Sequence, residues 1–495
     1  MLTGQYIGID FGTTNTAVVY VQYNEDGRKI ICLGENGQFP FSSIVAIPKN
    51  SESPLIFGRK VREQRLQLAE THEVYTSMKP FLGKKTASGE PVSFVVGGKR
   101  YYPGDITAAF LRHIKDYVKR NFDIGSDIDA ASFSFPVDFT PEARRELRKA
   151  AEQAGIKVMA CVSESTAAYI ANRAEGRAFS KVMVLDWGGG TLDISVLKLT
   201  GTSIHEISVG GGHIGGDDID RELAERVHSR IAAESGIPGG RFEDMQPAEK
   251  DQMIMRCEEA KISISDNGED YPLTVRNYGA YGTKNTTITE EQFDGIVEPL
   301  IKTRVLKAIN DTLAKAGGIS PASIDAIIIV GGSSNLRLFE RAVMNLFKDA
   351  KIIIPENVQW SVATGAALMQ IVGGNFQLSD DVCVLLSDET VFPVLRQGHT
   401  AAHPIKPISF SLTEDAKDAH FIFTDSTGKN VYTKQNVPTK GFLKETLELS
   451  ATIGDDQMAR IEITNKNFGE PKKTTIVELN KLTFHYDIGA LGNTD

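Results

Sequence analysis

The sequence predicts an α/β protein, in which a large domain of alternating strands and helices is followed by a small antiparallel β domain. Within residues 1–200, strand-length apolar runs alternate with helical patterns, which is typical of α/β proteins. Two glycine-rich signatures, IGIDFGTTNTAVV and VLDWGGGTLDISV, repeat one design: an apolar run, an Asp, a glycine turn with threonine, and a second apolar run. Beyond residue 388 the pattern changes to short strands with period-2 alternation.

The first part of the chain supplies both element types of an α/β domain. Helical patterns cover Pro103–Asn121 and Pro141–Ala154, and each has Pro at its start, where the missing N–H costs nothing. Thr140 precedes the second helix and is a suitable N-cap. Apolar runs predict strands at Tyr6–Asp10, Thr16–Gln22, Ser132–Pro136 and Lys181–Asp186.

The middle of the chain adds helices and a third glycine turn. A helical pattern runs from Gly215 to Ser265. In AIIIVGGSSNLRLFERAV, a buried strand runs into Gly331 and Gly332 and a helix follows. A polar stretch, GGNFQLSDD, then leads to the short apolar run Val382–Leu386, which we interpret as the centre of an interdomain linker over residues 377–388.

The last part reads as an antiparallel β domain. Turn sequences such as DSTGK and GDDQ separate its runs, and its size of about 100 residues is one that a β-sandwich can fill. Strands are predicted at Ile408–Leu412, His420–Thr424, Thr446–Ile453 and Ala459–Thr464.

Composition excludes several classes of protein. The net charge is −10 with no basic run, so nucleic acid is not the expected partner. The apolar runs are shorter than the ~20 residues that a spanning helix needs, so no membrane partner is expected. MLTGQYIGID lacks the pattern of a signal peptide, and four scattered cysteines form no CxxC pair, so we expect a cytoplasmic protein.

The glycine turns carry the chemistry. Without a Cβ, backbone N–H groups approach phosphate oxygens closely, and threonine hydroxyls add donors. An Asp at the end of each strand, Asp10 and Asp186, can hold Mg²⁺ through its waters. One such turn is weak support, but two matched turns and the third at Gly331 and Gly332 predict a nucleotide-binding protein.

These motifs give the chain a clear resemblance to a known family. It resembles the seventy-kilodalton heat-shock chaperones, the DnaK-like proteins, within the actin and sugar-kinase superfamily. Further matching segments are GGGHIGGDDID, RCEEAKISIS, IIIVGGSS and, in the β domain, ARIEITNKNFGEPKKTTIVEL. The resemblance implies an actin-like two-lobed ATPase domain with a duplicated ribonuclease H-like fold, followed by a small antiparallel β-sandwich.

The resemblance also implies domain boundaries. The nucleotide-binding domain would cover 1–376, with lobe I at about 1–182 and 361–376 and lobe II at about 183–360. The linker over 377–388 and a peptide-binding-like β domain over 389–495 would follow. No helical pattern follows the last strand, so we expect a variant without the helical lid.

Site residues carry over by position. Lys79, in SMKPFLGK, stands where the family has its catalytic lysine, and Glu164, Asp193 and Thr191 are the other expected catalytic residues. Asp10 and Asp186 would be the metal-binding pair. The expected nucleotide-binding residues are Gly12, Thr13, Thr14, Asn15, Gly188, Gly189, Gly190, Thr191, Gly215, Gly216, Glu258, Lys261, Ser265, Gly331, Gly332, Ser333 and Asn335. The expected cofactors are ATP or ADP with Mg²⁺ and, as a further candidate, K⁺.

Two smaller sets complete the expectations. Glu258, Lys261 and Ser265 fall at i, i+3 and i+7, which places them on one helix face. Pro136 and Arg144 match the family's relay between its two domains. No groove residue is named for peptide binding.

The sequence also departs from the family. Asn335 replaces an arginine that packs on adenine, Gln359 replaces an Asp, and Ser387 replaces an Asp in the linker. The resemblance implies a J-domain protein and a nucleotide-exchange factor as partners, but Ala160 stands where an arginine often meets J-domain partners.

We therefore expect an ATP-dependent chaperone-like protein that hydrolyses ATP slowly and controls the binding of apolar, unfolded polypeptide. The apolar run Val382–Leu386 would dock on the nucleotide domain with ATP and be exposed with ADP, unless it is always packed as a first β strand. Three alternatives remain: an ATP-gated adaptor for one dedicated partner, an actin-type filament former, and a small-molecule kinase.

Overall fold

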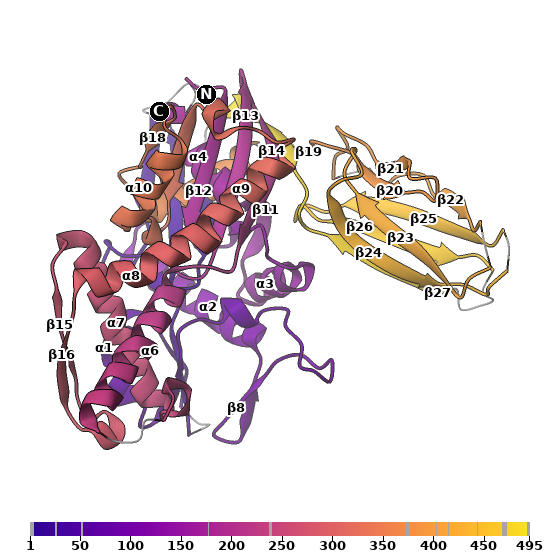
Figure 1. The fold of residues 1–495 in the computed structure, drawn as a ribbon. Coiled ribbons are helices and arrows are strands. Elements are labelled where there is room, and N and C mark those ends of the chain that lie inside the picture. The colour runs from indigo at the N-terminus through magenta and orange to yellow at the C-terminus, as the bar shows by residue number, and fades with distance from the viewer. Residues whose placement is uncertain are drawn as a thin grey trace.

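The computed structural model is a mixed α/β protein with several sheets, which confirms the coarse fold class (Figure 1). It describes residues 4–24, 27–50, 53–176, 178–236, 240–372, 376–401, 403–413, 415–442, 444–467 and 473–492. A large body carries both glycine-rich hairpins, and a set of antiparallel strands extends from one side of it. None of the helices in these described ranges is long and apolar enough to span a membrane.

The first large sheet has the strand order β11-β10-β1-β2-β3, with β4 paired to β2. β1 is antiparallel to β2 and parallel to β10, so the glycine turn between β1 and β2 lies at the end of a central strand. The strands are β1 Gly4–Phe11, β2 Asn15–Asn24, β3 Gly27–Cys32, β4 Phe41–Ser42, β10 Ala130–Phe135 and β11 Lys157–Ser163.

The second large sheet repeats this topology. Its order is β18-β17-β12-β13-β14-β28-β19, and β12 is antiparallel to β13 and parallel to β17, as β1 is to β2 and β10. The second glycine turn therefore occupies the same place as the first. The strands are β12 Lys181–Trp187, β13 Leu192–Thr200, β14 Ser203–Gly212, β17 Ala326–Val330, β18 Lys351–Ile353, β19 Phe376–Leu378 and β28 Phe484–Asp487.

Helices pack on the first sheet and between the two sheets. α2 (Pro103–Asn121) and α3 (Pro141–Gln153) confirm the two predicted helices, and the Thr140 hydroxyl accepts from Ala143 N at 3.3 Å as an N-cap. α4 (Glu164–Ala171) and α11 (Val358–Val372) pack on each other and on strands of the first sheet. α11 approaches so closely that a Cβ on Gly8 of β1 would lie 1.9 Å from the Ala363 carbonyl oxygen.

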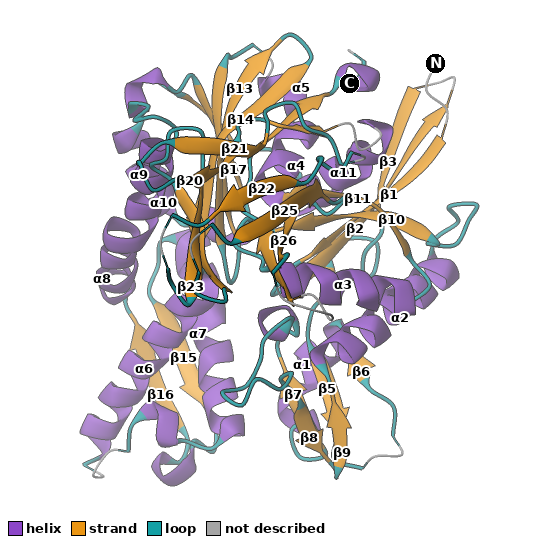
Figure 2. Ribbon diagram, turned by 90° about the vertical axis from the view of Figure 1, so that its right-hand side faces the viewer, coloured by secondary structure: helices purple, strands orange, loops and turns teal. Residues whose placement is uncertain are grey.

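Two groups of helices and short strands, here called arms, extend from the same side of the two large sheets (Figure 2). One arm holds α6 (Gly216–Ser235) and α7 (Pro247–Asn267), which confirm the predicted helical stretch. It also holds the hairpin of β15 (Tyr271–Val275) and β16 (Lys284–Ile288), while α8 (Glu290–Leu300), α9 (Leu306–Lys315) and α10 (Arg337–Leu346) lead back to the sheet. The other arm holds α1 (Arg59–Leu68), β5 (Val45–Pro48), β6 (Ile56–Phe57), β7 (His72–Tyr75), β8 (Phe94–Val96) and β9 (Lys99–Tyr101).

The extended part of the molecule contains two antiparallel four-stranded sheets, β21-β20-β23-β24 and β22-β25-β26-β27. The predicted strands here are confirmed, with ends that shift by a residue or two. The strands are β20 Val382–Leu385, β21 Val391–Leu395, β22 Ile408–Ser411, β23 Asp418–Thr424, β24 Val431–Pro438, β25 Thr446–Ile453, β26 Ala459–Asn465 and β27 Lys473–Leu479. Residues 468–472, within the family-matching segment ARIEITNKNFGEPKKTTIVEL, lie outside the described residues.

Two features differ from the expected linker over 377–388 and β domain over 389–495. The apolar run expected to be the linker centre is strand β20, paired with β21 and β23, and Val382 and Val384 are buried there. Burying each such side chain contributes about 1.5–3 kcal/mol, and a sheet provides this burial as well as a docked linker would. Strand β28 also returns to the second large sheet and pairs with β14 and β19.

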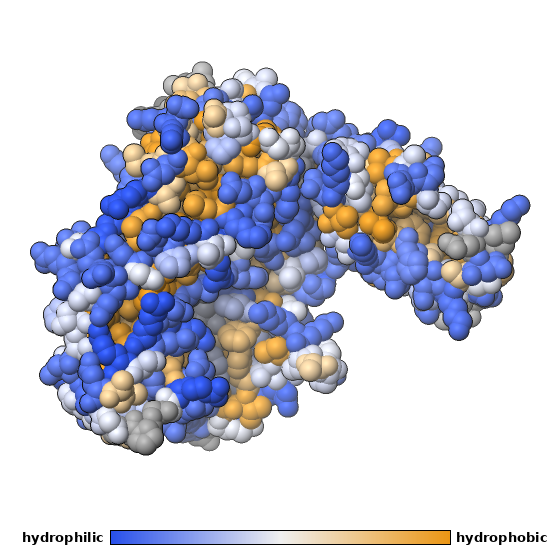
Figure 3. Space-filling model, in the orientation of Figure 1, coloured by the Kyte–Doolittle hydropathy of each residue, from blue (hydrophilic) through white to orange (hydrophobic). Residues whose placement is uncertain are grey.

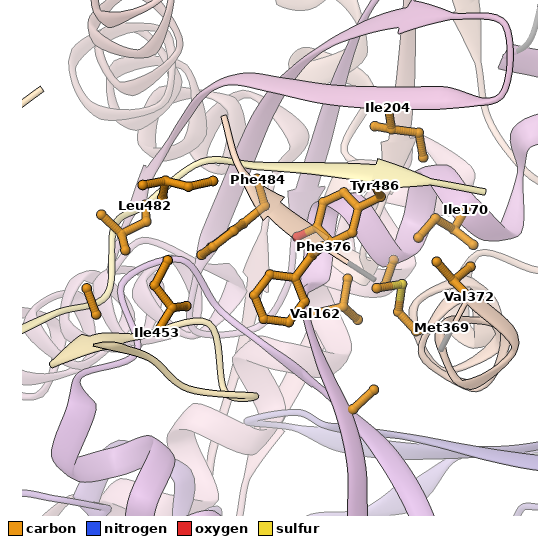
Figure 4. Packing of buried hydrophobic residues seen from close by; sticks show 14 of the residues in the cluster. Val162, Ile170, Ile204, Met369, Val372, Phe376, Ile453, Leu482, Phe484 and Tyr486 are labelled. Carbon is orange, nitrogen blue, oxygen red and sulfur yellow. The ribbon is translucent and has the colours of Figure 1, made fainter. Parts of the chain in front are cut away.

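One hydrophobic core joins the extended sheets to the body (Figure 4). The side chains of Phe484 and Tyr486 on β28 and Phe376 on β19 point into it. There they meet residues of five other elements: Val162 of β11, Ile170 of α4, Ile204 of β14, Met369 and Val372 of α11, and Ile453 of β25.

The surface of the extended part carries an apolar area near β20 and β21 (Figure 3). Phe392 on β21 is 39 % exposed and stands edge-to-face against Phe410 of β22, with ring centroids 5.7 Å apart. Phe410 makes the same kind of contact with Phe421 of β23. These ring contacts join strands of the two four-stranded sheets.

Candidate active site

The two predicted phosphate loops face each other across the body. The first, Gly12–Asn15, joins β1 to β2, and the second, Gly188–Thr191, joins β12 to β13. A Cβ on Gly189 would lie 2.1 Å from Thr14 Oγ1, and one on Gly190 would lie 2.9 Å from Thr13 Oγ1. The loops can approach this closely only because the second is made of glycine.

The third predicted loop closes against the second. Gly331 directly follows β17 with a φ of 88°, and a Cβ there would lie 2.5 Å from the Trp187 backbone carbonyl. Ser333 Oγ donates to the Gly188 carbonyl at 2.7 Å. Gly215, before α6, packs so tightly that its Cβ would lie 2.1 Å from the Gly189 carbonyl oxygen.

A cavity of about 650 Å³ lies where these loops meet. This volume falls in the usual range for small-molecule and cofactor sites. Nearly all of the sequence-predicted site residues line it, namely Asp10, Gly12, Thr13, Thr14, Asn15, Lys79, Glu164, Asp186, Gly188, Gly189, Gly190, Thr191, Glu258, Lys261, Ser265, Gly331, Gly332, Ser333 and Asn335. Gly215 and Gly216 stand just behind the loops, and Asp193 and Arg144 are buried outside the cavity. Pro136 lines a second cavity of about 730 Å³, which Lys79 also lines.

Lys79 forms a buried ion pair at the floor of the cleft. Its Nζ lies 2.8 Å from Oε1 of Glu164, the first residue of α4, and each residue is only 6 % exposed. Burial by itself lowers the pKa of Lys79, but the charges of Glu164, Asp10 and Asp193 outweigh burial and raise it. Lys79 therefore carries a fixed positive charge beside both phosphate loops.

The carboxyl groups around Lys79 outnumber it. Burial, and next the charge of Glu164, raise the pKa of Asp10 to about 6 and the pKa of Asp186 well above its usual value. The pKa of Asp193 is raised in the same way. The four carboxyl groups of Asp10, Glu164, Asp186 and Asp193 therefore lie near a single lysine. A divalent cation bound among them would reduce their mutual repulsion. Among the described residues no three His, Cys, Asp or Glu side chains form a closed metal site. The donor set of Asp10 and Asp186 fits Mg²⁺ that is held mainly by water and phosphate oxygens.

Asp193 connects the cleft to the predicted relay. Its Oδ1 accepts from Val137 N at 2.5 Å, and its Oδ2 is buried with no hydrogen-bond partner among the described residues. Val137 follows Pro136, whose carbonyl accepts from Phe139 N at 3.0 Å. The Phe139 carbonyl in turn accepts from Arg144 Nε at 3.3 Å.

Arg144 reaches from α3 to the extended strands. Its NH1 donates to the Asp456 carbonyl at 2.8 Å, and its NH2 donates to the Asn480 carbonyl at 3.3 Å. Asn480 Nδ2 donates back to the Phe139 carbonyl at 2.7 Å. Pro136 and Arg144 thus lie on a continuous chain of contacts from Asp193 to the loops beside β25 and β27.

Protein partners hold the face of α7 that carries the predicted nucleotide-binding residues Glu258, Lys261 and Ser265. Glu258 pairs with Arg62 at 2.6 Å, and Lys261 pairs with Asp220 at 2.6 Å. Ser265 Oγ donates to the Lys261 carbonyl at 2.6 Å. All three predicted residues line the cavity, so this polar face is turned toward the site.

Sequence reasoning missed several residues of this site. Arg62, on α1, forms its ion pair with Glu258 across the cleft, 196 positions along the chain. No motif marks Arg62, because its partner belongs to the opposite arm. Asp217 also lines the cavity, and its position directly after Gly216 in GGDDID was a usable signal. Gln359, noted as a departure, lines the cavity beside Asn335.

Comparison with known protein families identifies the family of this chain. The family model described as Hsp70 protein matches residues 6–395. The chain belongs to the Hsp70 family. The match includes every residue of the cleft described above and ends at the last residue of β21. Hsp70 proteins are ATPases with a chaperone function that depends on ATP, and they bind ATP or ADP together with Mg²⁺. They also bind unfolded polypeptide and co-chaperones.

Proposed function

We propose that this Hsp70 protein hydrolyses ATP slowly and uses the cycle to control how its extended β strands hold apolar, unfolded polypeptide. The observation that carries this proposal is the Lys79–Glu164 pair, which lies between two phosphate loops that face each other. The loops supply backbone N–H groups and the hydroxyls of Thr13, Thr14 and Thr191 as phosphate donors. Mg²⁺ bound near Asp10 and Asp186 would supply charge neutralisation at the phosphates.

In this proposal each residue has a separate task. Lys79 presents its charge to the terminal phosphate and stabilises the charge that develops during transfer. Glu164 orients Lys79 through their 2.8 Å contact. Asp193 has a raised pKa and one oxygen without a partner among the described residues, and these two properties support a role in taking a proton from water.

We also propose the finer fold assignment. The two large sheets share one order of parallel and antiparallel neighbours, which supports a duplicated ribonuclease H-like, actin-like body. The two four-stranded sheets share one core, which supports a β-sandwich. The alternative of an ATP-gated adaptor with little turnover gains support from β19 and β28, which tie the β strands to the body at both ends.

Steady-state phosphate release distinguishes the two functions. We expect slow hydrolysis that requires Mg²⁺ and changes when an unfolded apolar peptide is added. Hydrolysis at the same rate with and without peptide would favour the adaptor. An absence of ATP binding would refute both proposals.

A further inference from the structure

Strand β28 lies next to the edge of the second large sheet, between β14 and the edge strand β19. It pairs with β14 on one side, with Ile204 opposite Tyr486 and His205 opposite His485. On its other side it pairs with β19. Because β19 precedes β20 and β28 follows β27, the extended β strands leave the body and return to it through two neighbouring strands (Figure 1).

Glu206 fixes the position of β28. It follows His205 on β14, and its Oε2 accepts the Phe484 N–H at 2.8 Å just beyond the last paired residues. Its Oε1 accepts from the Tyr486 hydroxyl at 3.5 Å. Glu206 is 3 % exposed, so its carboxyl group is shielded from water and relies on these protein donors.

The same carboxyl also binds the start of α4. Thr166 Oγ1 donates to Glu206 Oε1 at 2.5 Å, and Ser163 Oγ donates to it at 3.3 Å. Ser163 is the N-cap of α4, and Glu164 is the first residue of that helix. Glu206 is therefore bonded to the one helical turn that also holds the partner of Lys79.

The hydrogen bonds of Tyr486 continue from Glu206 into the extended β strands. Gln457 Nε2, in the turn between β25 and β26, donates to the Tyr486 hydroxyl at 3.0 Å. Gln457 follows Asp456, whose carbonyl accepts from Arg144. Tyr486 itself is fully buried in the shared core (Figure 4).

We propose that Glu206 is a positioning residue that pins β28 to the body and couples the Lys79–Glu164 pair to the extended β strands through α4. A shift of the α4 turn on nucleotide binding moves Ser163 and Thr166, and Glu206 passes this movement to β28 and Tyr486. The coupling half of this inference rests on the proposed function, whereas the pinning of β28 does not.

Hydrogen exchange on the full chain tests the inference. The test variant is Glu206→Gln, whose amide has one acceptor oxygen in place of two. The matched control is Glu445→Gln, a buried carboxyl that accepts from Lys440 N and Asn465 Nδ2 within the extended strands.

We expect Glu206→Gln to speed amide exchange in β28 and β19 at least tenfold and to leave β12 unchanged. Glu445→Gln should keep exchange in β28 within twofold of the wild-type rate. Unchanged exchange of β28 in Glu206→Gln, or equal acceleration by both variants, would overturn the pinning. If Glu206→Gln does not fold, Tyr486→Phe replaces it, with at least threefold faster exchange of β28 expected.

The coupling has its own readout. ADP with Mg²⁺ should alter exchange of β28 in the wild type and have no effect on it in Glu206→Gln. A wild-type β28 that does not respond to bound ADP overturns the coupling. Failure of the wild type to hydrolyse ATP would instead count against the proposed function, because ADP binding and exchange do not require turnover.

Discussion

Replacing Lys79 with Ala should separate catalysis from binding. The Lys79 charge lies at the floor of the cleft and, in the proposed mechanism, acts on the terminal phosphate. Removing one such preorganised charge typically costs about 2–4 kcal/mol of barrier, or roughly 30- to 1,000-fold in rate. We expect nearly complete loss of ATP hydrolysis while ADP still binds.

The same change removes half of a buried ion pair, and this effect must be measured separately. Glu164 would be left unpaired near Asp10, Asp186 and Asp193, and removing one partner of a buried pair costs about 3–5 kcal/mol of stability. Adding Glu164→Gln to Lys79→Ala removes the unpaired charge. The double variant should recover most of the lost stability and still fail to hydrolyse ATP.

The assay combines phosphate release at saturating ATP, titration with a fluorescent ADP analogue, and thermal unfolding. Lys115→Ala is the control, because Lys115 pairs with Asp129 at 2.7 Å on the surface of the body, where a pair contributes only about 0–1 kcal/mol. Hydrolysis by Lys79→Ala within threefold of the wild-type rate would refute the reasoning. Recovery of hydrolysis in the double variant would show that the loss came from unfolding alone.

Gly189→Ala should weaken ADP binding at least tenfold, because the added Cβ would lie 2.1 Å from Thr14 Oγ1. The control is Gly188→Ala, which should bind ADP within threefold of the wild type because the atom nearest to its Cβ, Thr191 O, is 3.7 Å away. Equal ADP affinity of the two variants in a titration would contradict this prediction. Burial raises the pKa of Glu206 from 4.5 to about 7, so the folded state favours the protonated group, and its contribution to stability is greatest below pH 4.5 and is lost as pH rises through 7. This loss of stability amounts to about 3 kcal/mol. The urea midpoint of unfolding should therefore fall less between pH 5 and 7.5 in Glu206→Gln than in the wild type. Parallel pH profiles of the two proteins would contradict this assignment of the titrating group.

The glycine turns that line the cavity could be predicted from the sequence because their signals are local. A glycine turn between two strands is recognisable within a few residues, so Gly12–Asn15 and Gly188–Thr191 could be located from the sequence, and the structure brings them together at one cavity. Lys79 has no such local signature, and only its resemblance to the family's motif identified it. The predicted helices were confirmed for a similar reason, since caps and periodicity are local signals.

The tertiary structure decided which sheet each short strand joins. An apolar run such as Val382–Leu385 fits a linker as well as a strand. Its place is determined by its pairing with β21 and β23, which the sequence of the run does not show. The pairing of β28 with β14 joins residues at least 280 positions apart, as between His205 and His485, and no local pattern encodes it. Glu206 and Arg62 became recognisable only through partners that folding brings from distant segments. The sequence by itself therefore determined the chemistry of the cleft, whereas the tertiary structure decided how that cleft is joined to the β strands.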